Sequence, residues 1–189
     1  MKTQNLFRWG GLVAIVAAIF AVIGGLSSLN ERTVLGQWFS IASFALTVFS
    51  MMALYGAQAE RSGGLGLAGF VLTVLGATLL LIFQFAVLAR VSGVDPDRAV
   101  VQFFNKTPLG LLGPIGFVLG LILFGIATIR ARVFPRWAGA LIGIGAVLSL
   151  FGGETGVFMI LGLVSLLAIE LGIAWMGWAL WSSKSEMTA

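Results

Sequence analysis

The stretch from Val157 to Trp181 reads VFMILGLVSLLAIELGIAWMGWALW, an apolar run with a single carboxylate, Glu170, near its middle. At about 1.5 Å per residue, a helix over this stretch places Glu170 roughly 20 Å from one end and roughly 16 Å from the other. A hydrocarbon core is about 30 Å thick, so such a helix spans it and holds the acid near the midplane of the bilayer. An ionised acid at that depth costs on the order of 3 kcal/mol or more, so a functional role for an intramembrane Glu is the default hypothesis.

The composition of the whole chain is that of a membrane protein. Of its 189 residues, 59% are hydrophobic and only 10% are charged, whereas charged residues make up about 25% of a typical soluble domain. The chain contains no Cys and no His, which excludes thiolate and imidazole metal ligands, Cys nucleophiles and His general bases. The net charge is +4, but the basic residues are scattered over the ends of apolar segments, so we predict no nucleic-acid partner.

Six apolar segments predict an all-α protein, a single transmembrane bundle over residues 1–189. Helices are expected because lipid cannot satisfy a free backbone, and the alternating pattern of a membrane barrel does not occur. The predicted helices are Phe7–Leu29, Leu35–Ala57, Leu65–Ala89, Pro108–Ile129, Trp137–Phe151 and Val157–Trp181. The fifth is short for a membrane span.

One long connection, Arg90 to Thr107, has a pattern of its own. Asp95-Pro96-Asp97 combines an N-cap residue, a first-turn proline and a first-turn acid. Val100, Phe103 and Phe104 follow at helical spacing with polar residues between them. This pattern predicts a short amphipathic helix on the outer surface of the membrane.

The distribution of Lys and Arg predicts the orientation. With the N-terminus inside, the inner face carries Lys2, Arg8, Arg61, Arg130, Arg132, Arg136 and Lys184. The outer face then carries Arg32, Arg90, Arg98 and Lys106. Because cytoplasmic loops are the ones enriched in Lys and Arg, we predict that both termini lie in the cytoplasm.

Glu170 is the one carboxylate deep in a predicted span, and no Lys or Arg lies at a matching depth. Two interpretations follow. Glu170 either exchanges a proton for a cationic ligand, or stays neutral and hydrogen-bonded to a neighbouring helix or subunit. The second is the commoner situation for a buried acid.

The other candidate binding residues are Gln84, Ser43, Thr47 and Trp175. Ser43 and Thr47 share a helix face with Ser40 by their spacing, and with Gln84 they could line a polar seam. Such hydroxyls more often bond their own backbone one turn back. Trp175 follows Glu170 on the same helix and could stack on a cationic ligand. No catalytic triad, carboxylate pair or metal-ligand cluster occurs in the sequence, so we predict no enzyme activity, no cofactor and no metal site.

Two segments carry a family resemblance. They are Leu54-Tyr55-Gly56…Arg61-Ser62-Gly63…Leu67-Ala68-Gly69-Phe70 and Arg130-Ala131-Arg132-Val133-Phe134-Pro135-Arg136-Trp137-Ala138-Gly139. Both are similar to segments of uncharacterised bacterial six-helix membrane proteins of the DUF4386-like group. The resemblance covers most of the chain and implies a bacterial inner-membrane location, with no catalytic or binding residues to carry over. Size and helix count also resemble the substrate-binding components of energy-coupling-factor vitamin transporters.

Two functions remain open. The first is a non-enzymatic inner-membrane protein that packs with partners or binds a hydrophobic, lipid-like ligand. Its partners would be membrane lipids and either other membrane subunits or a second copy in a homodimer. The alternative is a small proton-coupled or cation-binding transporter, or the ligand-binding component of one, that uses Glu170.

Overall fold

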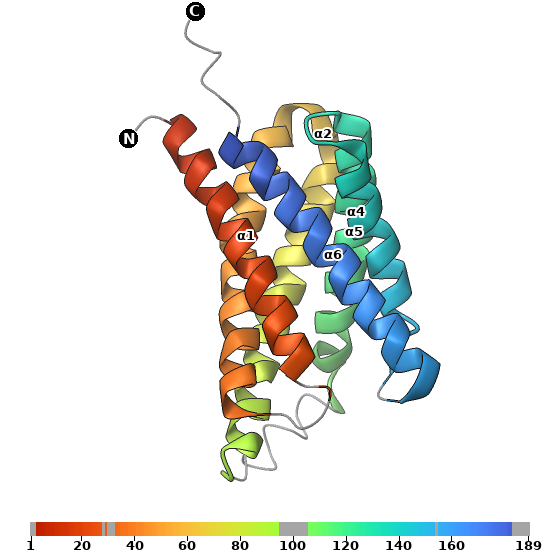
Figure 1. Cartoon of the computed structure of the whole chain (residues 1–189). Helices are drawn as coiled ribbons and strands as arrows, with labels where there is room; N and C mark the ends of the chain where they lie inside the picture. The colour runs from red at the N-terminus through yellow and green to blue at the C-terminus, as the bar shows by residue number, and fades with distance from the viewer. Residues whose placement is uncertain (1–2, 28, 30–32, 95–105, 154, 183–189) are drawn as a thin grey trace, which may run out of the picture.

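The computed structural model describes residues 3–27, 29, 33–94, 106–153 and 155–182 (Figure 1). The regular elements within these residues are all α-helices, in agreement with the predicted class. They are α1 (Thr3–Ser27), α2 (Val34–Val91), α4 (Pro108–Ala131), α5 (Arg136–Ser149) and α6 (Gly156–Ser182). The predicted surface helix over Asp95–Asn105 lies outside the described residues.

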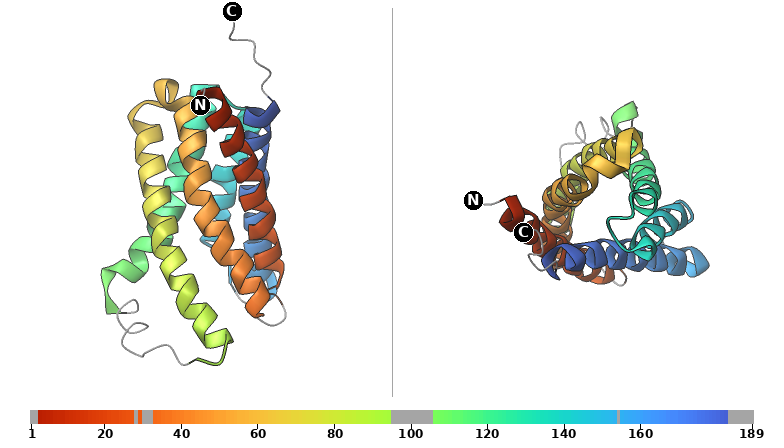
Figure 2. Two further views of the ribbon diagram at one scale, coloured as in Figure 1. Left: turned by 90° about the vertical axis from the view of Figure 1, so that its left-hand side faces the viewer. Right: turned by 90° about the horizontal axis from the view of Figure 1, so that it is seen from above.

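The prediction of six separate helices is not supported, because the described residues form five. The predicted helices Leu35–Ala57 and Leu65–Ala89 both belong to α2. Inside α2, Gly63 has φ 58° and ψ −159°, a non-helical conformation that glycine adopts at little steric cost. The chain reverses there, so α2 consists of two limbs, 34–62 and 64–91, that lie side by side (Figure 2).

Four of the described helices are long and apolar enough to cross a membrane: α1, α2, α4 and α6. The fifth, α5, is shorter, as the sequence predicted. Large apolar side chains cover the outside of the bundle; Trp137, for example, is 74% exposed and Leu111 is 67% exposed. Such a surface suits a protein whose surrounding solvent is hydrocarbon.

The helices form a closed ring. In chain order each packs on the next, and α6 returns to pack on α1 (Figure 2). The start of α1 and the end of α6 lie at the same end of the ring (Figure 1), where the rings of Trp9 and Trp181 are 6.2 Å apart. We call this the terminal end, and the opposite end, with Ser27, Val34 and Gly156, the far end.

α1 and α6 approach closely where they cross. A Cβ atom on Gly177 of α6 would lie 2.6 Å from the carbonyl oxygen of Gly11 on α1, so the contact requires glycine. Close backbone approach of this kind is a main source of helix association in lipid. It closes the ring next to the terminal end.

The hydrophobic core fills the half of the ring next to the terminal end. Its fully buried large apolar side chains come from four helices, α2, α4, α5 and α6: Met51, Leu54, Leu121, Phe124, Ile142, Ile173 and Met176. A buried polar pair accompanies them, in which Gln58 Nε2 donates to Thr128 Oγ1 over 3.2 Å. Side chains therefore fill this half of the interior, whereas the other half contains a cavity.

Candidate functional site

A partly open cavity of about 380 Å³ occupies the half of the ring next to the far end. All five described helices contribute to its wall. Ala21, Gly24, Gly25, Gln37, Ser40, Ser43, Phe44, Thr47, Phe83, Gln84, Phe117, Ser149, Gly162, Ser165, Leu166, Ile169 and Glu170 line it. Ile169 and Glu170 lie at the middle of α6 and Thr47 lies near the middle of the first limb of α2, whereas the other lining residues lie closer to the far end.

Helical spacing explains how the polar residues meet. On α6 the lining residues Gly162, Ser165, Leu166, Ile169 and Glu170 follow each other at intervals of three, one, three and one, which keeps them on one face of a helix. On the first limb of α2, the lining residues from Gln37 to Thr47 follow the same rule. These two faces point toward each other across the interior of the ring.

Glu170 lies at the inner end of the cavity. Its side chain is half-buried because part of it faces the cavity, but its Oε2 atom is fully buried and has no hydrogen-bond partner among the described residues. The lining residues of all five helices include no Lys or Arg and no second acid. An ionised carboxylate left in this environment would be costly, so the group requires a proton or a cation from outside the described chain.

The structure places Gln84, Ser43 and Thr47 around the same cavity as Glu170. Gln84 belongs to an amide pair that joins the two limbs of α2. Gln37 Nε2 donates to the backbone carbonyl oxygen of Gln84 over 3.0 Å and to its side-chain oxygen over 3.2 Å. Sequence reasoning missed Gln37, although it precedes Ser40 by three residues and so continues the same helix face.

The hydroxyl groups of the cavity fall into two sets. Ser40, Ser149 and Ser165 donate to backbone carbonyl oxygens at 3.2, 2.7 and 2.9 Å. For Ser40 and Ser149 the acceptor is in their own helix, the common arrangement for membrane helices. In the described part of the chain, the hydroxyls of Ser43 and Thr47 make no such bond. They remain available to a ligand.

Trp175 is not brought to the cavity. Its side chain is 45% exposed and is not part of the lining. Five residues separate it from Glu170, and at about 100° per residue the two side chains point about 140° apart around the helix. The predicted role of Trp175 in stacking on a ligand next to Glu170 is therefore not supported by its position.

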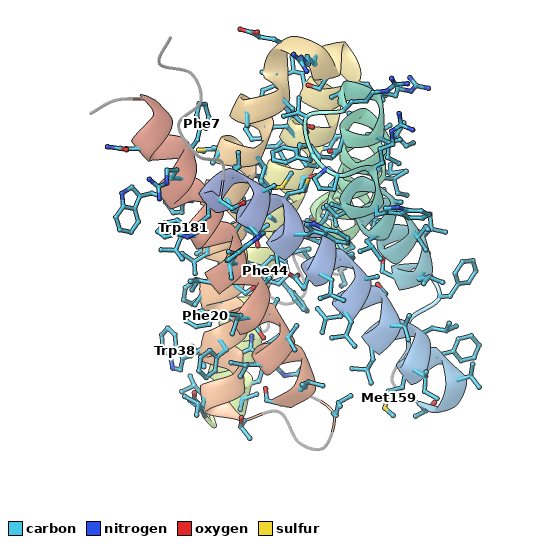
Figure 3. All side chains as sticks on the ribbon, turned by 45° about the horizontal axis from the view of Figure 1, so that its top comes forward. Phe7, Phe20, Trp38, Phe44, Met159 and Trp181 are labelled. Carbon is cyan, nitrogen blue, oxygen red and sulfur yellow. The ribbon has the colours of Figure 1, made fainter. Side chains whose placement is uncertain are left out.

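Aromatic side chains form another part of the wall. Phe44 of α2 and Phe117 of α4 meet edge to face, with ring centroids 5.8 Å apart. Figure 3 shows Phe44 inside the bundle, whereas Trp38, on the same limb of α2, lies on the outer side. The cavity thus combines one acid, several hydroxyl and amide groups, and an aromatic surface.

Comparisons of the chain with protein-family models, with curated proteins and with solved structures find no match. The resemblance to the DUF4386-like group stays a prediction, and the chemistry of the cavity is the basis for interpreting the site.

Proposed function

We propose that the chain is a polytopic protein of the bacterial cytoplasmic membrane that crosses the bilayer six times. Each limb of α2 has close to thirty residues and a length of roughly 40 Å, which suffices for a core of about 30 Å. The bias of Lys and Arg supports placing both termini, and with them the terminal end, in the cytoplasm. The far end, with the cavity, then faces the outside.

We further propose that the protein binds a small ligand in this cavity and exchanges a proton for it at Glu170. It would act as a small transporter or as the ligand-binding component of one, without catalysing a reaction. The observation that carries this proposal is the unpartnered Oε2 atom of Glu170 at a cavity. The hydroxyl and amide groups of the wall favour a partly polar ligand over a lipid-like one, which would need only apolar contacts.

The proposed exchange keeps the site neutral. Without ligand, the carboxyl group of Glu170 holds a proton, because a bare carboxylate in this environment is costly. When a cation enters, the proton leaves through the cavity to water, and the carboxylate pairs with the cation. The protonated carboxyl group and the carboxylate paired with a cation are both uncharged overall. Proton release and ligand binding are therefore coupled at Glu170.

The proposal is tested by titrating the intrinsic Trp fluorescence of the purified protein with pH. Wild type is expected to show a transition that Glu170→Gln lacks, because Gln cannot titrate. Trp175 lies about 7.5 Å from Glu170 along the axis of α6 and, although its side chain points away from the cavity, serves as the reporter of a change of charge at Glu170. Glu60→Gln is the matched control, because it removes an exposed acid far from the cavity and should leave the transition unchanged. A transition that persists in Glu170→Gln, or none in wild type, would contradict the proposal.

A further inference from the structure

We infer that the ligand of the cavity is a small organic monocation: an ammonium group that carries carbon substituents and a nearby hydrogen-bonding group. This inference rests on the proposed function and specifies its ligand. The ammonium group pairs with Glu170 at the inner end, and the polar group points toward the far end. Three properties of the wall lead to this class.

The first property is charge. Glu170 is the one ionisable side chain among the lining residues, which come from α1, α2, α4, α5 and α6. A ligand with one positive charge leaves the complex neutral. An anion would find no cationic partner in the wall, and a dication would keep one charge unmatched in a largely apolar environment.

The second property is the size and the apolar part of the wall. The cavity has a volume of about 380 Å³. This volume is within the range of small-molecule pockets, about 300 to 1,000 Å³, and far exceeds a single ion. Phe44, Phe117 and Leu166 offer aromatic and aliphatic contacts that suit carbon substituents. An ammonium group is also attracted to aromatic rings.

The third property is the placement of the free hydroxyls. Measured along the helices from the far end, Thr47 lies at about the depth of Glu170, and Ser43 lies about 6 Å closer to the far end. The amide pair of Gln37 and Gln84 lies closer still to that end. A ligand whose ammonium group sits beside Glu170 can therefore direct a hydroxyl group toward Ser43.

The experiment compares choline with its uncharged carbon isostere, dimethylbutanol, by calorimetry on the full chain in lipid nanodiscs. Choline is expected to bind wild type and to release about one proton per site, measured from the dependence of the heat on the ionisation enthalpy of the buffer. Glu170→Gln should weaken choline binding by at least about tenfold, or 1.4 kcal/mol. Glu170→Asp keeps the charge and should retain part of the affinity, and Glu60→Gln should bind like wild type.

Each other outcome overturns the inference in a distinct way. If dimethylbutanol binds as tightly as choline, charge does not select the ligand. If sodium or potassium chloride displaces choline or releases the proton in its place, the ligand is an inorganic cation. In both cases the proposed function stands as long as the fluorescence transition depends on Glu170. If choline does not bind while the fluorescence transition still depends on Glu170, the inference fails and the proposed function stands. If choline does not bind and that transition is also absent, the inference and the proposed function both fail.

Discussion

At the scale of single residues, two buried side-chain oxygens in the interior of the ring, Glu170 Oε2 and Gln58 Oε1, have no hydrogen-bond partner within the part of the chain that the structure describes. Their situations differ. Gln58 is neutral, is packed in the core and is held through its nitrogen by Thr128. Glu170 can ionise and faces a cavity. An unpaired buried charge costs far more free energy than an unpaired neutral group. Of the two side chains, Glu170 is therefore the one that we expect to bind a ligand.

Two threonines provide a matched test of this difference. Thr47→Val removes a hydroxyl that has no partner in the described chain, so stability should be unchanged. Binding of ethanolamine, whose primary ammonium group can donate to the Thr47 hydroxyl beside Glu170, should weaken about three- to tenfold, the loss of one hydrogen bond. Thr128→Val leaves Gln58 Nε2 without its acceptor, and should lower the free energy of unfolding by about 1–3 kcal/mol without weakening ligand binding. Thermal unfolding and calorimetry on both variants check this; equal effects of the two changes on either property would contradict it.

Part of the site could be predicted from the sequence alone. The depth of Glu170 follows from the length of the apolar run, and the shared face of Ser43 and Thr47 follows from their spacing. The contact between Gln37 and Gln84 could not be predicted, because it joins residues that are 47 positions apart and depends on how the chain reverses. The prediction for Trp175 differs in kind, because helix geometry alone places its side chain away from Glu170.

At the scale of the elements, glycine decides how the helices meet. Gly63 reverses α2, and for this reason two predicted segments became one element. A sequence pattern of apolar segments with a Gly-Gly pair between them indicates a boundary, but it does not give the dihedral angles at that boundary. The bounds of α4 and α6, by contrast, follow closely from hydropathy and from Pro108 at the first turn of α4.

The crossing of α1 and α6 leads to a prediction at this scale. Gly177→Ala inserts a Cβ atom 2.6 Å from Gly11 O and should destabilise the protein by about 1–3 kcal/mol, since neither backbone can yield freely. Gly143→Ala is the control. A Cβ atom there meets nothing within 4 Å, and alanine is favoured over glycine in a helix by up to about 1 kcal/mol. Unfolding in detergent should give Gly143→Ala a free energy of unfolding equal to or higher than that of wild type, and Gly177→Ala a lower one. The reverse order would refute the packing argument.

At the scale of the whole molecule, the ring is divided into a packed half and a hollow half. The core next to the terminal end is made of fully buried apolar side chains, and the cavity next to the far end reaches the middle of α6. The sequence predicted the apolar helices but not this division, because the ring is closed by α1 and α6 from opposite ends of the chain. A ligand should therefore reach Glu170 from the far end.

The chain contains no Cys, so single cysteines can report access to this cavity. The decisive measurement is the labelling of Ser43→Cys in intact cells with membrane-impermeant thiol reagents, one cationic and one anionic. Ser43 lines the cavity, and Val133, between α4 and α5 next to the terminal end, provides the control Val133→Cys. We predict that Ser43→Cys reacts from outside, faster with the cationic reagent, that Glu170→Gln removes this preference, and that Val133→Cys reacts only after permeabilisation. A Ser43→Cys that stays unlabelled, or a charge preference that does not depend on Glu170, would contradict the account.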